Sequence, residues 1–86
     1  MKITNKNVKS GVWSVDIDGV NVRVENKLST VKLFVKDELQ DIYLGMIGCP
    51  HLTGALPDGR PIKVAVGGDF KMHCYIFVDN KLVIED

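Results

Sequence analysis

The sequence predicts an all-β domain, a small β-sandwich of about eight short antiparallel strands. Apolar and polar residues alternate over several stretches, which is typical of strands with one buried face. Asp-Gly pairs separate some of these stretches, as they do in β-hairpins. The pattern repeats along the chain, so that residues 1–86 are expected to form one domain from two related halves, residues 11–45 and 51–86.

The first half contains four expected strands. Trp13 to Ile17 and Val20 to Glu25 carry apolar, mostly β-branched residues at every second position. Asp18-Gly19 between them predicts a two-residue hairpin turn. Lys32 to Val35 predicts a third strand, followed by a tight turn and a fourth strand. A short helix over Lys36 to Tyr43 is the alternative for this last segment, because its early acidic residues suit a helix N-terminus.

The second half follows the same plan after a crossover. Gly45 to Pro50 is rich in glycine and proline and is expected to carry the chain from one sheet to the other. Pro57-Asp58-Gly59 predicts the next turn, because proline presets φ and glycine permits a positive φ. Ile62 to Val66 and His73 to Val78 predict strands, and a tight turn at Asp79-Asn80 leads to the last strand.

The two halves align at two shifts. Asp18-Gly19 matches Asp58-Gly59 at a shift of 40 residues, whereas Phe34-Val35 matches Phe77-Val78 at a shift of 43. An insertion of three residues near Gly67-Gly68-Asp69 accounts for the difference. Two four-stranded units of this kind are expected to pack face to face, and a five-stranded barrel similar to an OB-fold is the alternative.

The stretch His73-Cys74-Tyr75-Ile76-Phe77-Val78-Asp79-Asn80-Lys81-Leu82-Val83-Ile84-Glu85 resembles the C-terminal hairpin of the Fas apoptotic inhibitory molecule family. The resemblance implies a β-sandwich with Val-Asp-Asn or Val-Asp-Gly turns and no enzymatic activity. The earlier segment Lys32 to Asp37 lacks the Val-Asp-Gly form of the turn. The resemblance therefore covers only the last hairpin, and it transfers no functional residue.

Charge and composition exclude several classes of function. Eleven basic and eleven acidic residues cancel, so the chain gains little from counterion release, and this disfavours nucleic acid as a partner. No apolar run approaches the ~18 residues of a membrane helix. The N-terminal sequence lacks the apolar region of a signal peptide. The two cysteines are therefore expected to be reduced, which predicts a cytoplasmic location.

Cys49, His51, His73 and Cys74 form the one group of soft metal ligands in the sequence. Zinc is held by four such groups in a tetrahedron, so the number of ligands fits. The spacing fits poorly, because the adjacent His73 and Cys74 would point to opposite faces of a strand. A zinc site is thus an alternative hypothesis, and the preferred interpretation is a protein without a cofactor.

Catalysis finds little support in the sequence. No serine lies in a Gly-x-Ser-x-Gly elbow. Paired carboxylates such as Asp16 and Asp18 lie in expected turns or on solvent faces, where their pKa values suit no acid or base role. We therefore predict that the chain is not an enzyme.

Two expected strands, Lys32 to Val35 and His73 to Val78, are apolar on both faces. A small sandwich covers one face of each sheet, so the remaining apolar residues indicate a protein interface. The candidate interface residues are Phe34, Tyr75 and Val83. The leading hypothesis is a non-enzymatic interaction or structural module that binds a protein partner or forms a homodimer.

Two alternatives remain open at this point. One is a protein that binds a small ligand or a metal ion. The other is an oligonucleotide-binding barrel that uses Lys63, Lys71 and Tyr75, because nucleic-acid platforms combine basic and aromatic side chains.

Overall fold

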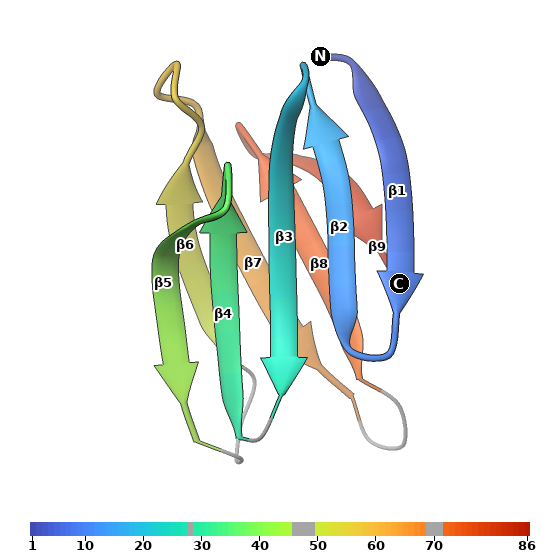
Figure 1. Cartoon of the computed structure of the whole chain (residues 1–86), viewed down its shortest axis with the longest axis vertical. Helices are drawn as coiled ribbons and strands as arrows, with labels where there is room; N and C mark the ends of the chain where they lie inside the picture. Colours follow the sequence, from blue (N-terminus) through green and yellow to red (C-terminus); the bar gives the residue numbers. More distant parts are fainter. Residues whose placement is uncertain (28, 46–49, 69–71) are drawn as a thin grey trace.

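The computed structural model of the chain is a two-layer β-sandwich (Figure 1). It describes residues 1–27, 29–45, 50–68 and 72–86. Over these ranges the strands are β1 (Ile3–Lys9), β2 (Val12–Ile17), β3 (Val20–Lys27), β4 (Thr30–Val35), β5 (Glu38–Leu44), β6 (His51–Ala55), β7 (Pro61–Gly67), β8 (His73–Val78) and β9 (Lys81–Glu85).

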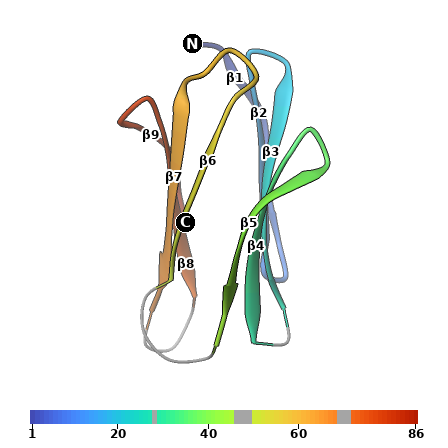
Figure 2. The same cartoon turned by 90° about the vertical axis from the view of Figure 1, so that its left-hand side faces the viewer.

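The strands form two antiparallel sheets whose order follows the chain. One sheet, here called sheet A, has the order β1-β2-β3-β4-β5, and the other, sheet B, has the order β6-β7-β8-β9. Figure 2 shows the two sheets as separate layers facing each other. The predicted all-β sandwich is confirmed, and the arrangement is two sheets rather than a five-stranded barrel.

The predicted repeat corresponds to two four-stranded units, β2 to β5 and β6 to β9. The alignment shift between the two units changes in the connection between their second and third strands. β3 ends at Lys27 and β7 at Gly67, whereas β4 begins at Thr30 and β8 at His73. The extra length therefore lies between β7 and β8, as the sequence predicts.

The last hairpins of the two units, β4–β5 and β8–β9, have the same turn geometry. Lys36 and Asp37 connect β4 to β5 with φ angles of 53° and 63°, and Asp79 and Asn80 connect β8 to β9 with φ angles of 51° and 63°. Two consecutive positive φ angles belong to the primed turns whose twist matches that of paired strands. Residues 38–44 after the first of these turns form the strand β5, so the preferred expectation holds there and the helical alternative does not.

The first hairpins of the two units, β2–β3 and β6–β7, differ in the length of their connections. Asp18 and Gly19 form a two-residue turn with φ angles of 49° and 82°. In the second half the connection runs from Leu56 to Arg60, and the Leu56 amide donates to the carbonyl of Arg60 at 2.9 Å. The shared Asp-Gly pair thus occurs in a tight turn in one half and in a longer loop in the other.

A β-bulge follows each of the two matching turns. In β5 the pairing passes from Phe34 opposite Leu39 to Leu33 opposite Asp41, which leaves Gln40 as the extra residue. In β9 the extra residue is Val83, between Leu82 and Ile84. A bulge changes which face the following side chains take. This is why Val83 and Ile84 are both buried although they are adjacent.

The burial of Val83 corrects the sequence analysis. Strict alternation along β9 places Val83 and Ile84 on opposite faces, and that leaves one of them outside the core. Val83 is 2% exposed and belongs to the core cluster, whereas Leu82 is 44% exposed. Val83 therefore contributes to the stability of the sandwich and is removed from the candidate interface.

Strand β1 was not expected from the sequence. It pairs with β2 at one edge of sheet A, and its register shifts between Thr4 and Asn7. All its side chains except that of Thr4 are exposed. A strand with so few buried residues lacks the alternation by which the other strands are recognised.

The core lies between the two sheets. Alternate residues of β2, β3, β4, β7 and β8 project into it, as the predicted period of two requires. Its members are Trp13, Val15, Ile17, Val22, Val24, Val31, Leu33, Val35, Leu52, Leu56, Ile62, Val64, Val66, Cys74, Ile76, Val78, Val83 and Ile84.

We predict that Val83→Ala destabilises the fold without acting on association. The change removes two buried methyl groups, which is expected to lower the free energy of unfolding by about 2 kcal/mol. Leu82→Ala, one position earlier and half exposed, is the matched control and should cost much less. Urea unfolding measures both variants, and equal losses would contradict the assigned burial.

Candidate functional site

The three predicted interface residues do not share a surface. Phe34 lies on the outer face of sheet A, because its neighbours Leu33 and Val35 are buried in the core. Tyr75 lies on the outer face of sheet B, next to the buried Cys74 and Ile76. With Val83 in the core, the sequence-based interface is divided over both sides of the sandwich.

The outer face of sheet A carries an apolar surface beside Phe34. Three residues of β5 project from this face with large exposed fractions: Leu39 is 52% exposed, Ile42 is 42% and Leu44 is 72%. Leu39 lies opposite Phe34 in the sheet register. We call Phe34, Leu39, Ile42 and Leu44 the β4–β5 patch. These three β5 residues were not predicted from the sequence, because the bulge breaks their period of two.

The bulge in β5 also sends two polar side chains toward sheet B. The Thr53 amide of β6 donates to Oδ2 of Asp41 at 2.9 Å, and the Ala55 amide donates to Oε1 of Gln40 at 3.3 Å. These bonds satisfy backbone groups on the free edge of β6. Gly54 lies between them, and a Cβ atom there would come within 3.0 Å of Leu33. The two sheets are therefore linked by hydrogen bonds along part of their β5–β6 side. A cavity of about 350 Å³ lies on the same side, and Val35, Glu38, Ala55 and Leu56 are among the residues that line it.

A charged cluster borders the β4–β5 patch. The Arg23 guanidinium donates to Asp37 at 2.7 Å and to Glu25 at 2.8 Å, and it stacks over the Phe34 ring at 4.5 Å from the centroid. The hydrogen bond to Asp37, followed by that to Glu25, raises the pKa of Arg23 despite its partial burial. One face of the Phe34 ring is thus covered by Arg23, and the side chain is only partly exposed.

A second charged cluster joins the two Asp-Gly segments at one end of the sandwich. Arg60 donates to Asp18 at 2.7 Å, and it also binds Asp58 at 2.8 Å. Asp18 also accepts the Lys2 amide at 2.7 Å. This backbone bond, followed by the bond to Arg60, lowers the pKa of Asp18, and the bond to Arg60 lowers that of Asp58. These carboxylates are stabilised as anions, which is the opposite of what a general acid requires.

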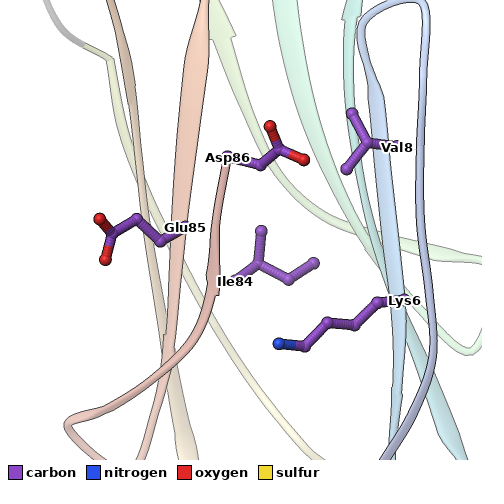
Figure 3. Close-up of a pocket in the computed structure, with 5 residues that line it drawn as sticks. All are labelled: Lys6, Val8, Ile84, Glu85 and Asp86. Carbon is purple, nitrogen blue, oxygen red and sulfur yellow. The ribbon is translucent and has the colours of Figure 1, made fainter.

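The side of the sandwich between β1 and β9 is open. A cavity of about 250 Å³ lies there, lined by Lys6, Val8, Ile84, Glu85 and Asp86. Figure 3 shows Ile84 and Asp86 of the β9 segment on one wall and Lys6 and Val8 of β1 on the other, with Glu85 directed away from the gap. The edge strands β1 and β9 thus leave an accessible space between the two sheets.

The predicted metal ligands are not brought together within the described part of the chain. His51 is exposed on β6, and His73 is exposed on β8. Cys74 is buried in the core, and this burial raises the pKa of its thiol to about 12. A thiol that resists ionisation is a poor metal ligand. Cys49 lies outside the described residues, and over the described ranges no three His, Cys, Asp or Glu side chains form a metal-holding group.

Two of the three residues predicted for oligonucleotide binding, Lys63 and Tyr75, lie in the described part of the chain. Lys63 and Tyr75 both project from the outer face of sheet B, on the neighbouring strands β7 and β8. Lys71 lies outside the described residues. Lys63 lies opposite Phe77, so this face places Lys63 beside two aromatic side chains, those of Tyr75 and Phe77.

Comparison with known proteins gives no relative. No family model matches the sequence, and neither the search of curated proteins nor the search of solved structures returns a match. In the described segments of the chain, no helix is long and apolar enough to cross a membrane.

We predict that the Arg60 cluster makes stability depend on acid pH. Because the folded-state pKa values of Asp18 and Asp58 lie below 3.8, their contribution is present above that pH and is lost as the pH falls through the folded-state values. Arg60→Gln should weaken this acid loss. Urea unfolding between about pH 5 and pH 2 measures it, with Lys81→Gln as the control. An unchanged acid loss in Arg60→Gln would contradict the prediction.

Proposed function

We propose that the chain is a non-enzymatic interaction module that self-associates through the β4–β5 patch. The observation that carries the proposal is the exposure of Leu39, Ile42 and Leu44 on one face, with Leu44 at 72%. Contiguous exposed apolar side chains are typical of surfaces that bind another protein. The partner we propose is a second copy of the same chain, packed face to face.

The protected strand edges favour association through the face of a sheet rather than through a sheet edge. Unpaired strand edges associate readily unless bulges, lysines or side-chain bonds protect them. Three edge strands, β1, β5 and β9, contain register shifts. The fourth, β6, has two of its amides bound by Asp41 and Gln40. Addition of a strand to either sheet is therefore disfavoured.

Charge supports pairing of two copies in opposite directions. Lys27 and Lys32 flank the Leu44 end of the patch, since Lys27 pairs with Thr30 opposite Leu44 and Lys32 lies opposite Ile42. At the other end, Arg23 beside Phe34 is bound by two carboxylates, those of Asp37 and Glu25. A two-fold axis through the patch would place the lysines of one copy near these carboxylates of the other. The zero net charge of the chain adds no repulsion.

The non-enzymatic part of the proposal is supported by the state of the carboxylates. Hydrogen bonds lower the pKa of Asp16, Asp18 and Asp58, and all three lie at the surface. Such groups serve as structural anions rather than as proton donors. The proposal also places the chain in the cytoplasm, where the free thiol of Cys74 is compatible with the reducing environment.

Native mass spectrometry and sedimentation, over a wide range of protein concentration, test the proposal. The wild-type chain is expected to form dimers, and Leu39→Thr combined with Leu44→Thr is expected to be monomeric. Threonine retains the propensity for strands, so the double variant should fold. Leu82→Thr is the matched control, because Leu82 follows the equivalent turn and lies opposite Phe77 as Leu39 lies opposite Phe34.

Each outcome is decisive. A monomeric wild-type chain, or a dimer that persists in the double variant, would refute association through this patch. A dimer lost in Leu82→Thr and retained in the double variant would assign the contact to sheet B. A mass increment of one zinc ion would instead favour the metal-binding alternative.

A further inference from the structure

The outer face of sheet B carries two neighbouring aromatic side chains. Tyr75 and Phe77 are two residues apart on β8 and project from the same face, because the residues that alternate with them, Cys74, Ile76 and Val78, are buried. Tyr75 is 36% exposed, and Phe77 is partly exposed. The Cα atoms of residues two positions apart on a strand are separated by about 7 Å, so this face offers two aromatic rings at that repeat.

The strands around these rings contain no carboxylate side chain. Over their full lengths β6, β7 and β8 include neither aspartate nor glutamate, although the whole chain has eleven acidic residues. The nitrogen-bearing side chains on these strands, Lys63, His51 and His73, are all exposed. Histidine can donate a hydrogen bond in either protonation state. The zero net charge of the chain therefore does not describe this face, which is complementary to an anion.

The register of the strands places two of these donors beside the aromatic rings. Ala65 of β7 lies opposite His51 on one side and opposite Tyr75 on the other. Lys63 precedes Ala65 by two residues on the same face and lies opposite Phe77. Residues directly opposite each other have Cβ atoms about 5 Å apart. Because Ala65 is small, an anionic group above it would be within reach of both Lys63 and His51.

The combination of rings and donors identifies the class of ligand. An acidic peptide would use the cation but has no need of the two rings, and a neutral sugar would stack on the rings but gain no charge attraction from Lys63. A single-stranded nucleic acid carries a planar base for each ring and a phosphate between successive bases. Proteins that bind single strands combine aromatic side chains, on which bases stack, with basic side chains along the backbone.

We propose that the outer face of sheet B binds single-stranded nucleic acid, with two successive bases stacked on Tyr75 and Phe77 and a phosphate beside Lys63 and His51. Only a few phosphates are contacted, so the balanced charge of the chain is compatible with weak binding of this kind. Figure 2 shows the sheets as separate layers, so this face lies on the opposite side of the sandwich from the β4–β5 patch. The proposal is therefore independent of self-association.

Glu85 indicates the path of the strand across the sheet. It lies opposite Tyr75 on β9, on the side away from β7, and it is directed away from the gap between the sheets (Figure 3). Within the described strands of sheet B it is the one carboxylate that projects from this face. Because Glu85 repels phosphate, the backbone of the nucleic acid is expected to lie over β7 and β6 rather than over β9.

Fluorescence anisotropy with a labelled oligothymidylate of about ten nucleotides tests the proposal at low salt. Binding to the wild-type chain is expected with a dissociation constant of about 10–100 μM. An abasic oligomer of the same length carries the same phosphates and no bases, and it is expected to bind at least about tenfold more weakly. No saturable binding of oligothymidylate, or equal binding of the abasic oligomer, would overturn the proposal.

Two substitutions of Tyr75 test the stacking. Tyr75→Thr keeps the propensity for a strand and removes the ring, so binding is expected to weaken at least about fivefold. Tyr75→Phe keeps the ring and should bind like the wild-type chain. Equal affinity of the Thr and Phe variants would show that no base stacks on this residue.

The salt dependence tests the phosphate contact. Each phosphate bound on a single strand contributes about −0.7 to the slope of log affinity against log salt. Lys63→Gln should make this slope shallower by about 0.7, whereas Lys9→Gln, on β1 of the other sheet, should leave it unchanged. Equal slopes in the two variants would refute the placement of a phosphate beside Lys63.

Glu85→Gln provides a test that does not depend on a loss of binding. Removal of the carboxylate is expected to strengthen binding about twofold at low salt, because one repulsion of phosphate disappears. Weaker binding in this variant would contradict the path away from β9.

Two further comparisons separate this proposal from its alternatives. The double variant Leu39→Thr and Leu44→Thr should bind oligothymidylate like the wild-type chain, whatever its oligomeric state, so failure of self-association and failure of nucleic-acid binding are distinguishable. A neutral glucose oligomer, or polyglutamate, should not displace the oligothymidylate. Displacement by the sugar would assign the face to a carbohydrate, and displacement by polyglutamate would assign it to an acidic protein; either result would overturn the proposal.

Discussion

The extra residue in each of two edge strands determines which side chains face the core and which face outward. After a bulge, two successive side chains turn toward the opposite sheet, and the alternation resumes one residue later. In β5 these two residues are Gln40 and Asp41, and in β9 they are Val83 and Ile84. The two pairs occupy equivalent positions in the repeat. Their chemistry differs, and most of the asymmetry of the molecule follows from that difference.

The polar pair links the two sheets on one side of the sandwich, and the apolar pair forms no such links on the other side within the described residues. Gln40 and Asp41 bind amides of β6, so the edges of the two sheets are linked by hydrogen bonds. Val83 and Ile84 have no such bonds to offer, and they pack into the core instead. Among the residues that the structure describes, the edge of β9 therefore has no side-chain links to β1 like those that join β5 to β6, and two cavities lie on this side.

The fold could be predicted from the sequence wherever side chains follow a strict period of two. Trp13, Val15 and Ile17 are all buried, as their spacing predicts. The alignment shift between the two halves changes near Gly67, where the β7–β8 connection is longer than the β3–β4 connection. The candidate site could not be predicted in the same way. A bulge leaves no reliable mark in local sequence, so the burial of Val83 and the outward faces of Ile42 and Leu44 follow only from the pairing of the strands. Strand β1 escaped prediction because its pairing with β2 buries almost none of its side chains.

The repeat gives each sheet one outward leucine directly after the second turn, Leu39 in sheet A and Leu82 in sheet B. Beyond it the two strands diverge. On β5 the next outward residues are Ile42 and Leu44, whereas on β9 Glu85 follows. On sheet A the exposed apolar side chains therefore continue along β5 itself, whereas on sheet B Leu82 adjoins Phe77 and Tyr75 of β8. Two adhesive faces on opposite sides of a sandwich would permit stacking without end, because each added copy would expose a new face. The proposed association through the β4–β5 patch alone would instead limit it to a closed pair.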